Sequence, residues 1–86
     1  PGYQANAMLV QDIPDARVGE FGARLAREPG VTLCYQRPRV PPDWPYNLFC
    51  MIHGQARDEV EAKIAELRTR LNFDDYPHDV LFSFAR

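Results

Sequence analysis

Cysteine is scarce in this sequence, and long hydrophobic runs are missing. The two cysteines, Cys34 and Cys50, do not form a C-x-x-C pair and are too few for a secreted disulfide scaffold. No third thiolate or clear histidine partner stands at ligand spacing, so no metal site is expected. The longest apolar runs fall far short of the roughly 20 residues that span a bilayer. These absences favour a cytoplasmic protein with reduced thiols, and a labile disulfide is the alternative.

Lysine and net positive charge are also lacking. The net charge is −2, and nine of the ten basic residues are arginine, with Lys63 as the single lysine. Proteins that bind nucleic-acid phosphates normally show a basic stripe, so this composition argues against such contact. Arginine binds planar carboxylates through two hydrogen bonds, although codon bias would give the same count. Only Arg37 and Arg39 stand beside other candidate site residues.

Common catalytic motifs and a secretory signal are absent as well. The sequence has no glycine-rich phosphate loop, no nucleophile elbow and no H-E-x-x-H pattern. Residues 1–6 lack both the basic and the apolar region of a signal peptide. With 86 residues and Pro1 rather than Met at its start, the chain is expected to be one domain, residues 1–86, excised from a longer protein.

The apolar pattern predicts four strands and two helices. Strands are expected at residues 5–13, 31–37, 47–53 and 80–84, and helices behind Asp15 (Val18, Phe21, Leu25) and Asp58 (Val60, Ile64, Leu67, Leu71). The order β-α-β-β-α-β predicts a ferredoxin-like α+β sandwich with an antiparallel sheet and both helices on one face. The other sheet face is then left to dimerise, to bind a ligand, or to do both.

A proline-rich connection joins the second and third strands. Residues 38–45 contain four prolines, which favours a stiff, extended loop. If the two strands pair with Cys34 opposite Cys50, one face combines aromatic and apolar area with a cation, an amide and an imidazole, as in a ligand wall. In this register Arg37 lies opposite Asn47, Tyr35 opposite Phe49 and Val31 opposite His53, and Met51 is a further member of the wall. The opposite face, which would pack beneath the helices, carries Thr32, Cys34, Leu48, Cys50 and Ile52.

Each member of this wall also has an ordinary structural interpretation. A lone histidine is more often a hydrogen-bonded structural or turn residue than a catalyst, which applies to His53 and to His78. Arg37 at a strand end is more often solvated. Aromatic residues such as Trp44 and Tyr46 more often pack in a core or loop. Residue types and spacing alone therefore leave the function open.

Several stretches resemble one known family. Cys34-Tyr35-Gln36-Arg37-Pro38 and Pro42-Asp43-Trp44-Pro45-Tyr46-Asn47-Leu48-Phe49-Cys50-Met51-Ile52-His53-Gly54 are similar to the signature of siroheme decarboxylases, Lrp/AsnC-like proteins of heme d1 and alternative heme biosynthesis. The opening Gly2-Tyr3-Gln4-Ala5-Asn6-Ala7 and the Pro29-Gly30-Val31 turn also resemble theirs. Family members usually begin with a winged helix-turn-helix domain, which is absent here, and usually continue past the last strand with a basic, Tyr-containing tail.

The resemblance implies an activity and a set of site residues. The expected reaction removes the carboxyl groups of two siroheme acetates to give didecarboxysiroheme, with no cofactor beyond this iron tetrapyrrole substrate. His53 is the expected proton donor, Tyr35 the second choice, and His78 a further candidate from a partner chain. The expected substrate-binding residues are Arg37, Arg39, Trp44, Tyr46, Asn47, Phe49, Met51 and His78. A homodimer or a heterodimer with a paralogous subunit is expected, without nucleic-acid or membrane contact by this domain.

Two other functions compete with the enzyme. An AsnC-type regulator domain would bind an amino acid or a tetrapyrrole between subunits and convert nothing. A non-catalytic subunit would dimerise with an active paralogue. Binding of a tetrapyrrole would distinguish the enzyme and the non-catalytic subunit from a sensor of amino acids. Turnover by the protein alone would then indicate the enzyme, and turnover only with a partner would indicate the non-catalytic subunit.

Overall fold

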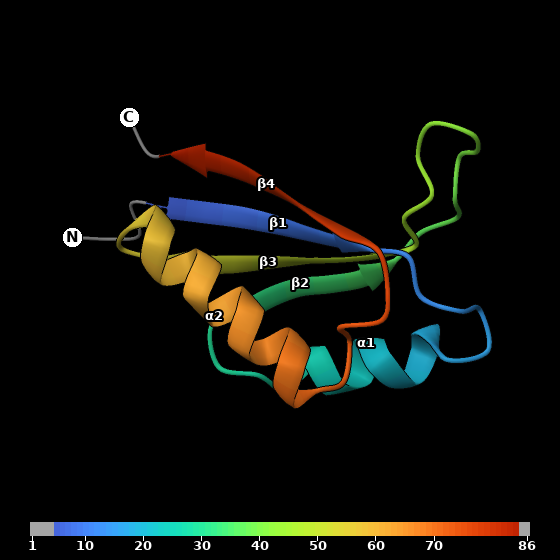
Figure 1. Cartoon of the computed structure of the whole chain (residues 1–86), viewed down its shortest axis with the longest axis horizontal. Coiled ribbons are helices and arrows are strands. Elements are labelled where there is room, and N and C mark those ends of the chain that lie inside the picture. Colours follow the sequence, from blue (N-terminus) through green and yellow to red (C-terminus); the bar gives the residue numbers. More distant parts are fainter. Residues whose placement is uncertain (1–4, 85–86) are drawn as a thin grey trace.

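The computed structural model describes residues 5–84, which form the expected β-α-β-β-α-β order. The elements are β1 (Ala5–Gln11), α1 (Val18–Ala26), β2 (Val31–Gln36), β3 (Leu48–Gly54), α2 (Arg57–Arg70) and β4 (His78–Phe84). Figure 1 shows both helices on the same face of the sheet, with the 38–46 loop projecting from one end. The predicted ferredoxin-like α+β sandwich is confirmed.

The sheet is antiparallel, with strand order β2-β3-β1-β4. Its two central strands are β3 and β1. Strand β1 pairs with β3 from Ala5↔Gly54 to Gln11↔Leu48 and with β4 from Ala5↔Phe84 to Gln11↔His78. Each β-α-β unit therefore places its two strands on either side of a third, and β2 and β4 are the edge strands. The chain ends of the described region lie together at one end of the sheet (Figure 1).

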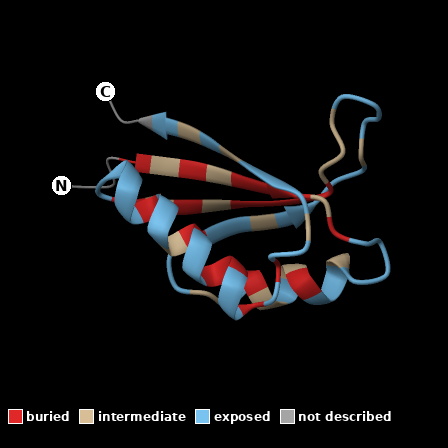
Figure 2. Cartoon of the chain, in the orientation of Figure 1, coloured by how far each residue is buried: buried red, intermediate tan, exposed pale blue. Residues whose placement is uncertain are grey.

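The core lies between the helices and the sheet face that they cover. On α1, Phe21 and Leu25 are fully buried, as the predicted apolar stripe requires. Phe21 stacks on Phe73, which follows α2, with ring centroids 4.7 Å apart. In Figure 2 the buried positions run along β1 and β3 and along the sheet-facing sides of both helices. Burial of these apolar side chains supplies most of the stabilisation of so small a domain.

The start of α1 differs from the prediction that a helix follows directly on Asp15. The helix begins at Val18, and its N-cap residue Arg17 makes no side-chain capping hydrogen bond. Asp15 instead accepts hydrogen bonds from Arg39 and from Asn47. A carboxylate engaged by a guanidinium is unavailable to cap a helix, and this tertiary contact displaces the local one.

Helix α2 buries the predicted stripe of Val60, Ile64 and Leu67, and one charged residue besides. The Arg68 side chain is 5% exposed, and its Nη1 donates to Gln11 Oε1 at 2.7 Å. Its Nη2 donates to the Tyr76 carbonyl at 2.9 Å. Burial lowers the pKa of Arg68 from its usual value. This arginine therefore ties α2 to the end of β1 and to the loop before β4.

Strand β2 contains an irregularity that the predicted register lacked. Tyr35 lies opposite Phe49 as expected, but Thr32 lies opposite Met51 and Val31 opposite Ile52, with a shift between Thr32 and Tyr35. Leu33 and Cys34 therefore both face Cys50, which is a β-bulge. Leu33 has a φ of 51°, the left-handed region, and its side chain is 70% exposed.

The bulge corrects two predicted positions. Val31 was expected opposite His53, on the wall; it pairs with Ile52 instead and joins the core. Thr32 was expected to face the helices; it lies beside Met51 and bonds to His53 instead. Because side chains alternate along a strand, one additional residue reverses the face of every position before it.

Candidate active site on the uncovered sheet face

The sheet face opposite the helices carries four of the ten predicted site residues, and two more, Arg37 and Trp44, line a cavity at its end. Residues paired across neighbouring strands share a face, so the register defines it. We call it the open face; it consists of Asn6, Met8 and Val10 on β1, Thr32 and Tyr35 on β2, Phe49, Met51 and His53 on β3, and Asp79, Leu81 and Ser83 on β4.

One end of the open face forms an aromatic cavity. Its volume is about 550 Å³, and it is lined by Met8, Tyr35, Arg37, Pro38, Val40, Trp44 and Phe49. The rings of Tyr35 and Phe49 stack with centroids 5.5 Å apart, and Trp44 lies 6.1 Å from Phe49. A cavity with flat apolar walls and one cation suits a planar ligand that carries carboxylates.

Arg37 is the cation of this aromatic cavity. Its backbone N–H donates to the Asn47 carbonyl at 3.0 Å, which continues the β2–β3 ladder and fixes its position. Within residues 5–84 the Arg37 guanidinium makes neither an ion pair nor a hydrogen bond, and the residue is exposed. Its five N–H donors are therefore available to a ligand carboxylate.

The loop that supplies Trp44 is fixed at its tip and at its base. Val40 and Trp44 exchange backbone hydrogen bonds of 2.8 and 3.0 Å across the tip. The Trp44 ring meets Tyr46 edge to face at 5.1 Å, so Tyr46 supports Trp44 while lying outside the cavity lining. The aromatic wall is thus formed before any ligand is present.

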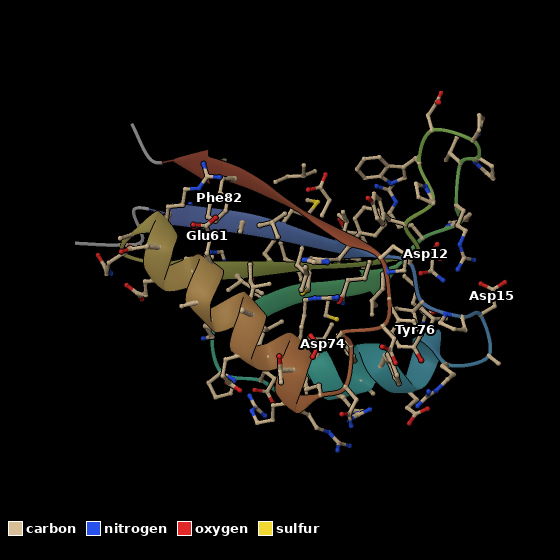
Figure 3. The ribbon with its side chains drawn as sticks, in the orientation of Figure 1. Asp12, Asp15, Glu61, Asp74, Tyr76 and Phe82 are labelled. Atoms are coloured by element: carbon tan, nitrogen blue, oxygen red, sulfur yellow. The ribbon has the colours of Figure 1, made fainter. Side chains whose placement is uncertain are left out.

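Arg39 anchors the base of this loop, and it was expected to reach a ligand. Its Nη2 donates to Asp12 at 2.8 Å and to the Ile13 carbonyl at 2.7 Å, and its Nη1 bonds to Asp15. Figure 3 shows Asp12 and Asp15 where β1 leads toward α1. We call Arg39, Asp12, Asp15 and the Ile13 carbonyl the Arg39 cluster. The hydrogen bond from Arg39 is the main reason that the pKa of Asp15 lies below its usual value.

Asn47 also turns inward, away from the wall on which it was predicted. It is 5% exposed; its Oδ1 accepts from the Ile13 N–H at 2.9 Å, and its Nδ2 donates to the Ile13 carbonyl at 2.8 Å. The Asn47 side chain therefore supplies the buried Ile13 N–H and carbonyl with the hydrogen bonds that a neighbouring strand would otherwise make. Together with Arg37 and Arg39, Asn47 lines a second cavity of about 440 Å³.

The opposite end of the open face is polar. The His53 ring lies between two strands: Nδ1 is 2.7 Å from Asn6 Oδ1 on β1, and Nε2 is 2.8 Å from Thr32 Oγ1 on β2. Asn6 and Thr32 were not among the predicted site residues. No sequence signal marks Thr32, because the bulge that turns it toward His53 is formed at Leu33 without a glycine.

His53, the expected proton donor, and Arg37, an expected substrate-binding residue, are not neighbours. Arg37 lies level with Asn47, six residues from His53 along β3, which is about 20 Å in an extended strand. Met8 and Met51 pair between the two ends and form an apolar middle. Tyr35 is the predicted proton donor that shares the aromatic cavity with Arg37.

His78 lies on the other side of the sheet. It begins β4, pairs with Gln11 and borders a groove of about 410 Å³ with Arg68 and Asp74. Burial, helped by the Arg68 charge, lowers the pKa of His78 from its usual value. Within one chain His78 therefore does not join His53, Tyr35 or Arg37.

The cysteines lie on the helix-facing side. Both are free thiols; Cys34 is half-buried and Cys50 is buried. A hydrogen bond between them lowers the pKa of Cys34 and raises that of Cys50, and burial raises the latter further. Within residues 5–84 no group of three or more His, Cys, Asp or Glu side chains could hold a metal ion.

Comparison with known proteins assigns the family. The model of the AsnC-like ligand-binding domain matches residues 1–86. The chain belongs to this family. The AsnC-like domain is 56% identical over 82 residues to the siroheme decarboxylase NirL subunit of Stutzerimonas stutzeri, covering 95% of this chain and 48% of that protein. It is 46% identical to the NirDL subunit of Paracoccus denitrificans (strain Pd 1222), covering 95% of this chain and 25% of that one.

A solved structure agrees with the sequence comparison. The AsnC-like domain superposes on the siroheme decarboxylase NirDL with a TM-score of 0.81 at 33% identity, covering 94% of this chain and 25% of that chain. A second NirDL structure, a co-complex with an iron-uroporphyrin III analogue, gives a TM-score of 0.79 at 32% identity, covering 92% of this chain and 25% of that one. The chain thus spans between a quarter and about half of the decarboxylase chains that it resembles. None of its helices within residues 5–84 has the length and apolarity to cross a membrane.

Proposed function

We propose that this AsnC-like domain belongs to a siroheme decarboxylase subunit and that its open face binds siroheme. The aromatic cavity carries this proposal together with the Arg37 guanidinium, which is unpaired within residues 5–84, because they offer a flat apolar wall and a cation to a planar polycarboxylate. The similarity to decarboxylase subunits, one of them solved with an iron-uroporphyrin III analogue, supports the choice of ligand. The iron tetrapyrrole is the substrate, and the proposal includes no further cofactor.

The proposed reaction breaks the bond between each acetate methylene carbon and its carboxylate. Carbon dioxide leaves, the electron pair remains on the methylene carbon and spreads into the pyrrole, and one proton converts that carbon to a methyl group. A general acid close to the carbon speeds this step, by about 10²–10⁴-fold in comparable reactions. Tyr35 lies in the cavity with Arg37 and would serve an acetate there. His53 would serve an acetate at the polar end.

The partner and the location are parts of the same proposal. Siroheme decarboxylase relatives occur as NirL, NirH, NirDL and beta subunits. We therefore expect the open face to bind siroheme against a second subunit, identical or paralogous, in the cytoplasm. A partner subunit could also contribute its own proton donors to the apolar middle of the face.

The test is anaerobic incubation of the full-length protein with siroheme, followed by absorbance for binding and by mass spectrometry for the loss of carboxyl groups. Binding with loss of two carboxyl groups supports the proposal. If the protein binds no siroheme, either alone or together with its paralogous subunit, the proposal is refuted. Binding without loss in both cases would favour a ligand sensor, which the family description also suits.

Arg37→Gln tests the cavity itself. Loss of charge-assisted hydrogen bonds to a carboxylate costs about 1.5–3 kcal/mol, so siroheme should bind roughly 10- to 100-fold more weakly. Arg27→Gln is the matched control, since Arg27 is an exposed arginine at the end of α1, away from the cavity. Equal weakening in both variants would mean that general electrostatic attraction, and not the cavity, binds the ligand.

A further inference from the structure

The β-bulge on β2 has a direct effect at His53. Without it, the Tyr35↔Phe49 register would continue and Thr32 would lie beside Ile52, facing the helices. With it, Thr32 lies beside Met51 on the open face and its Oγ1 is 2.8 Å from His53 Nε2. Bulges commonly redirect a side chain next to an active site.

The bulge is maintained although its backbone is strained. Leu33 adopts a φ of 51°, which leucine disfavours by roughly 1–2 kcal/mol, and no glycine relieves it. The Leu33 side chain is 70% exposed, so burial of an apolar group does not repay this cost. Strain of this kind concentrates where a structure holds functional groups in place.

Asn6 holds the other nitrogen of the same ring. Its Oδ1 is 2.7 Å from His53 Nδ1, and an amide oxygen can only accept. Nδ1 must therefore carry a hydrogen. In the neutral ring Nε2 is then the basic nitrogen, and it accepts from the Thr32 hydroxyl. Free neutral histidine prefers its hydrogen on Nε2, so this pair of contacts imposes the less common tautomer.

We propose that Asn6 and Thr32 are positioning residues for His53, with Asn6 fixing the hydrogen on Nδ1 and Thr32 linking Nε2 to the open face. When His53 takes up a proton, Nε2–H donates to Thr32 Oγ1, and the hydroxyl hydrogen of Thr32 points toward the ligand. To protonate the substrate carbon, the Thr32 hydroxyl gives its hydrogen to that carbon. At the same time the Thr32 oxygen takes up the hydrogen from His53 Nε2. This last step rests on the proposed function; the tautomer does not.

The test is nitrogen-15 NMR of the full-length protein labelled at histidine, at a pH where His53 is neutral. The wild type should show Nδ1 as the protonated nitrogen and Nε2 as the unprotonated one. Asn6→Ala should move the hydrogen to Nε2. His78 is the internal control, because it lies on the opposite sheet face and its signals should not change. A wild-type His53 with its hydrogen on Nε2 overturns the proposal.

The bulge and the hydroxyl are tested separately. Leu33→Gly keeps the left-handed conformation without strain and should leave the His53 signals unchanged. Thr32→Val removes the hydroxyl at constant shape and should shift the Nε2 signal, while Thr32→Ser should restore it. An unshifted Nε2 in Thr32→Val overturns the role of Thr32.

Turnover of siroheme then separates this inference from the proposed function. If the wild type converts siroheme, Thr32→Val should slow conversion by about 10²-fold or more with binding unchanged, and Thr32→Ser should recover it. Unchanged turnover in Thr32→Val overturns the proton path. If the wild type converts nothing, the proposed function fails while the NMR result still decides the tautomer.

Discussion

Asn47→Ala is the sharpest test of how the candidate site is supported. The substitution removes the acceptor of the Ile13 N–H and one of the donors to the Ile13 carbonyl. Ile13 is 0% exposed, so its N–H is left without a partner at a cost of about 1–3 kcal/mol. The Ile13 carbonyl keeps its hydrogen bond from Arg39, so losing the Asn47 donor costs less there, about 0.5–1.5 kcal/mol. The sum is about 1.5–4.5 kcal/mol, a large part of the 5–15 kcal/mol typical of a domain.

Urea unfolding measures this loss. The midpoint should fall while the slope with denaturant concentration stays constant, because the same surface is exposed on unfolding. Gln55→Ala, at an exposed position between β3 and α2, is the control and should change the free energy of unfolding by less than about 0.5 kcal/mol. A loss below about 1 kcal/mol in Asn47→Ala would refute the reasoning. Siroheme affinity of the folded variant should be close to that of the wild type, since Asn47 points at the backbone.

Two further predictions concern the ionised groups. Arg39 lowers the pKa of Asp15 in the folded state. The stabilisation that this ion pair gives the fold is therefore fully present above about pH 3.8, the usual pKa of Asp15 in the unfolded chain, and it is lost as the pH falls through the lower pKa of the folded state. Asp15→Asn should therefore reduce the drop in melting temperature between pH 7 and pH 3, and an unchanged drop would contradict it. Arg68→Met leaves Gln11 Oε1 and the Tyr76 carbonyl without their Arg68 donors, at about 1–3 kcal/mol each, and should therefore cost about 2–6 kcal/mol in urea unfolding. Arg57→Met, on the exposed side of α2, should cost less than about 1 kcal/mol, and equal losses would show that burial of Arg68 does not matter.

The fold could be predicted because its signals are local and repeated. Val60, Ile64 and Leu67 recur at helical spacing, and the helix they predict buries them. The register that sets Cys34 opposite Cys50 also predicts Tyr35 opposite Phe49, and these two residues do pair. The count failed beyond Leu33, because a single residue in a left-handed conformation shifts the ladder and leaves no compositional mark.

The candidate site was only partly predictable because side-chain partners are set by tertiary structure. Arg37 and Arg39 look equivalent in the sequence, yet one guanidinium is unpaired among the described residues and the other binds two aspartates. The apolar pattern starts the last strand at Val80 and leaves His78, an expected substrate-binding residue, outside it; β4 begins at His78, and the register places this residue on the helix-facing side of the sheet. Whether the predicted residues bind substrate stays a prediction.

The bulge at Leu33 also bears on how copies of the domain can associate. An exposed edge strand offers a row of backbone donors and acceptors to which another chain can add. On β2 that row is interrupted where Leu33 and Cys34 share one partner, and the local twist departs from that of a regular strand. A second chain cannot extend the sheet past this point in continuous register. A strand added at this edge would have to stop at the bulge, which disfavours edge-to-edge aggregation at the β2 side.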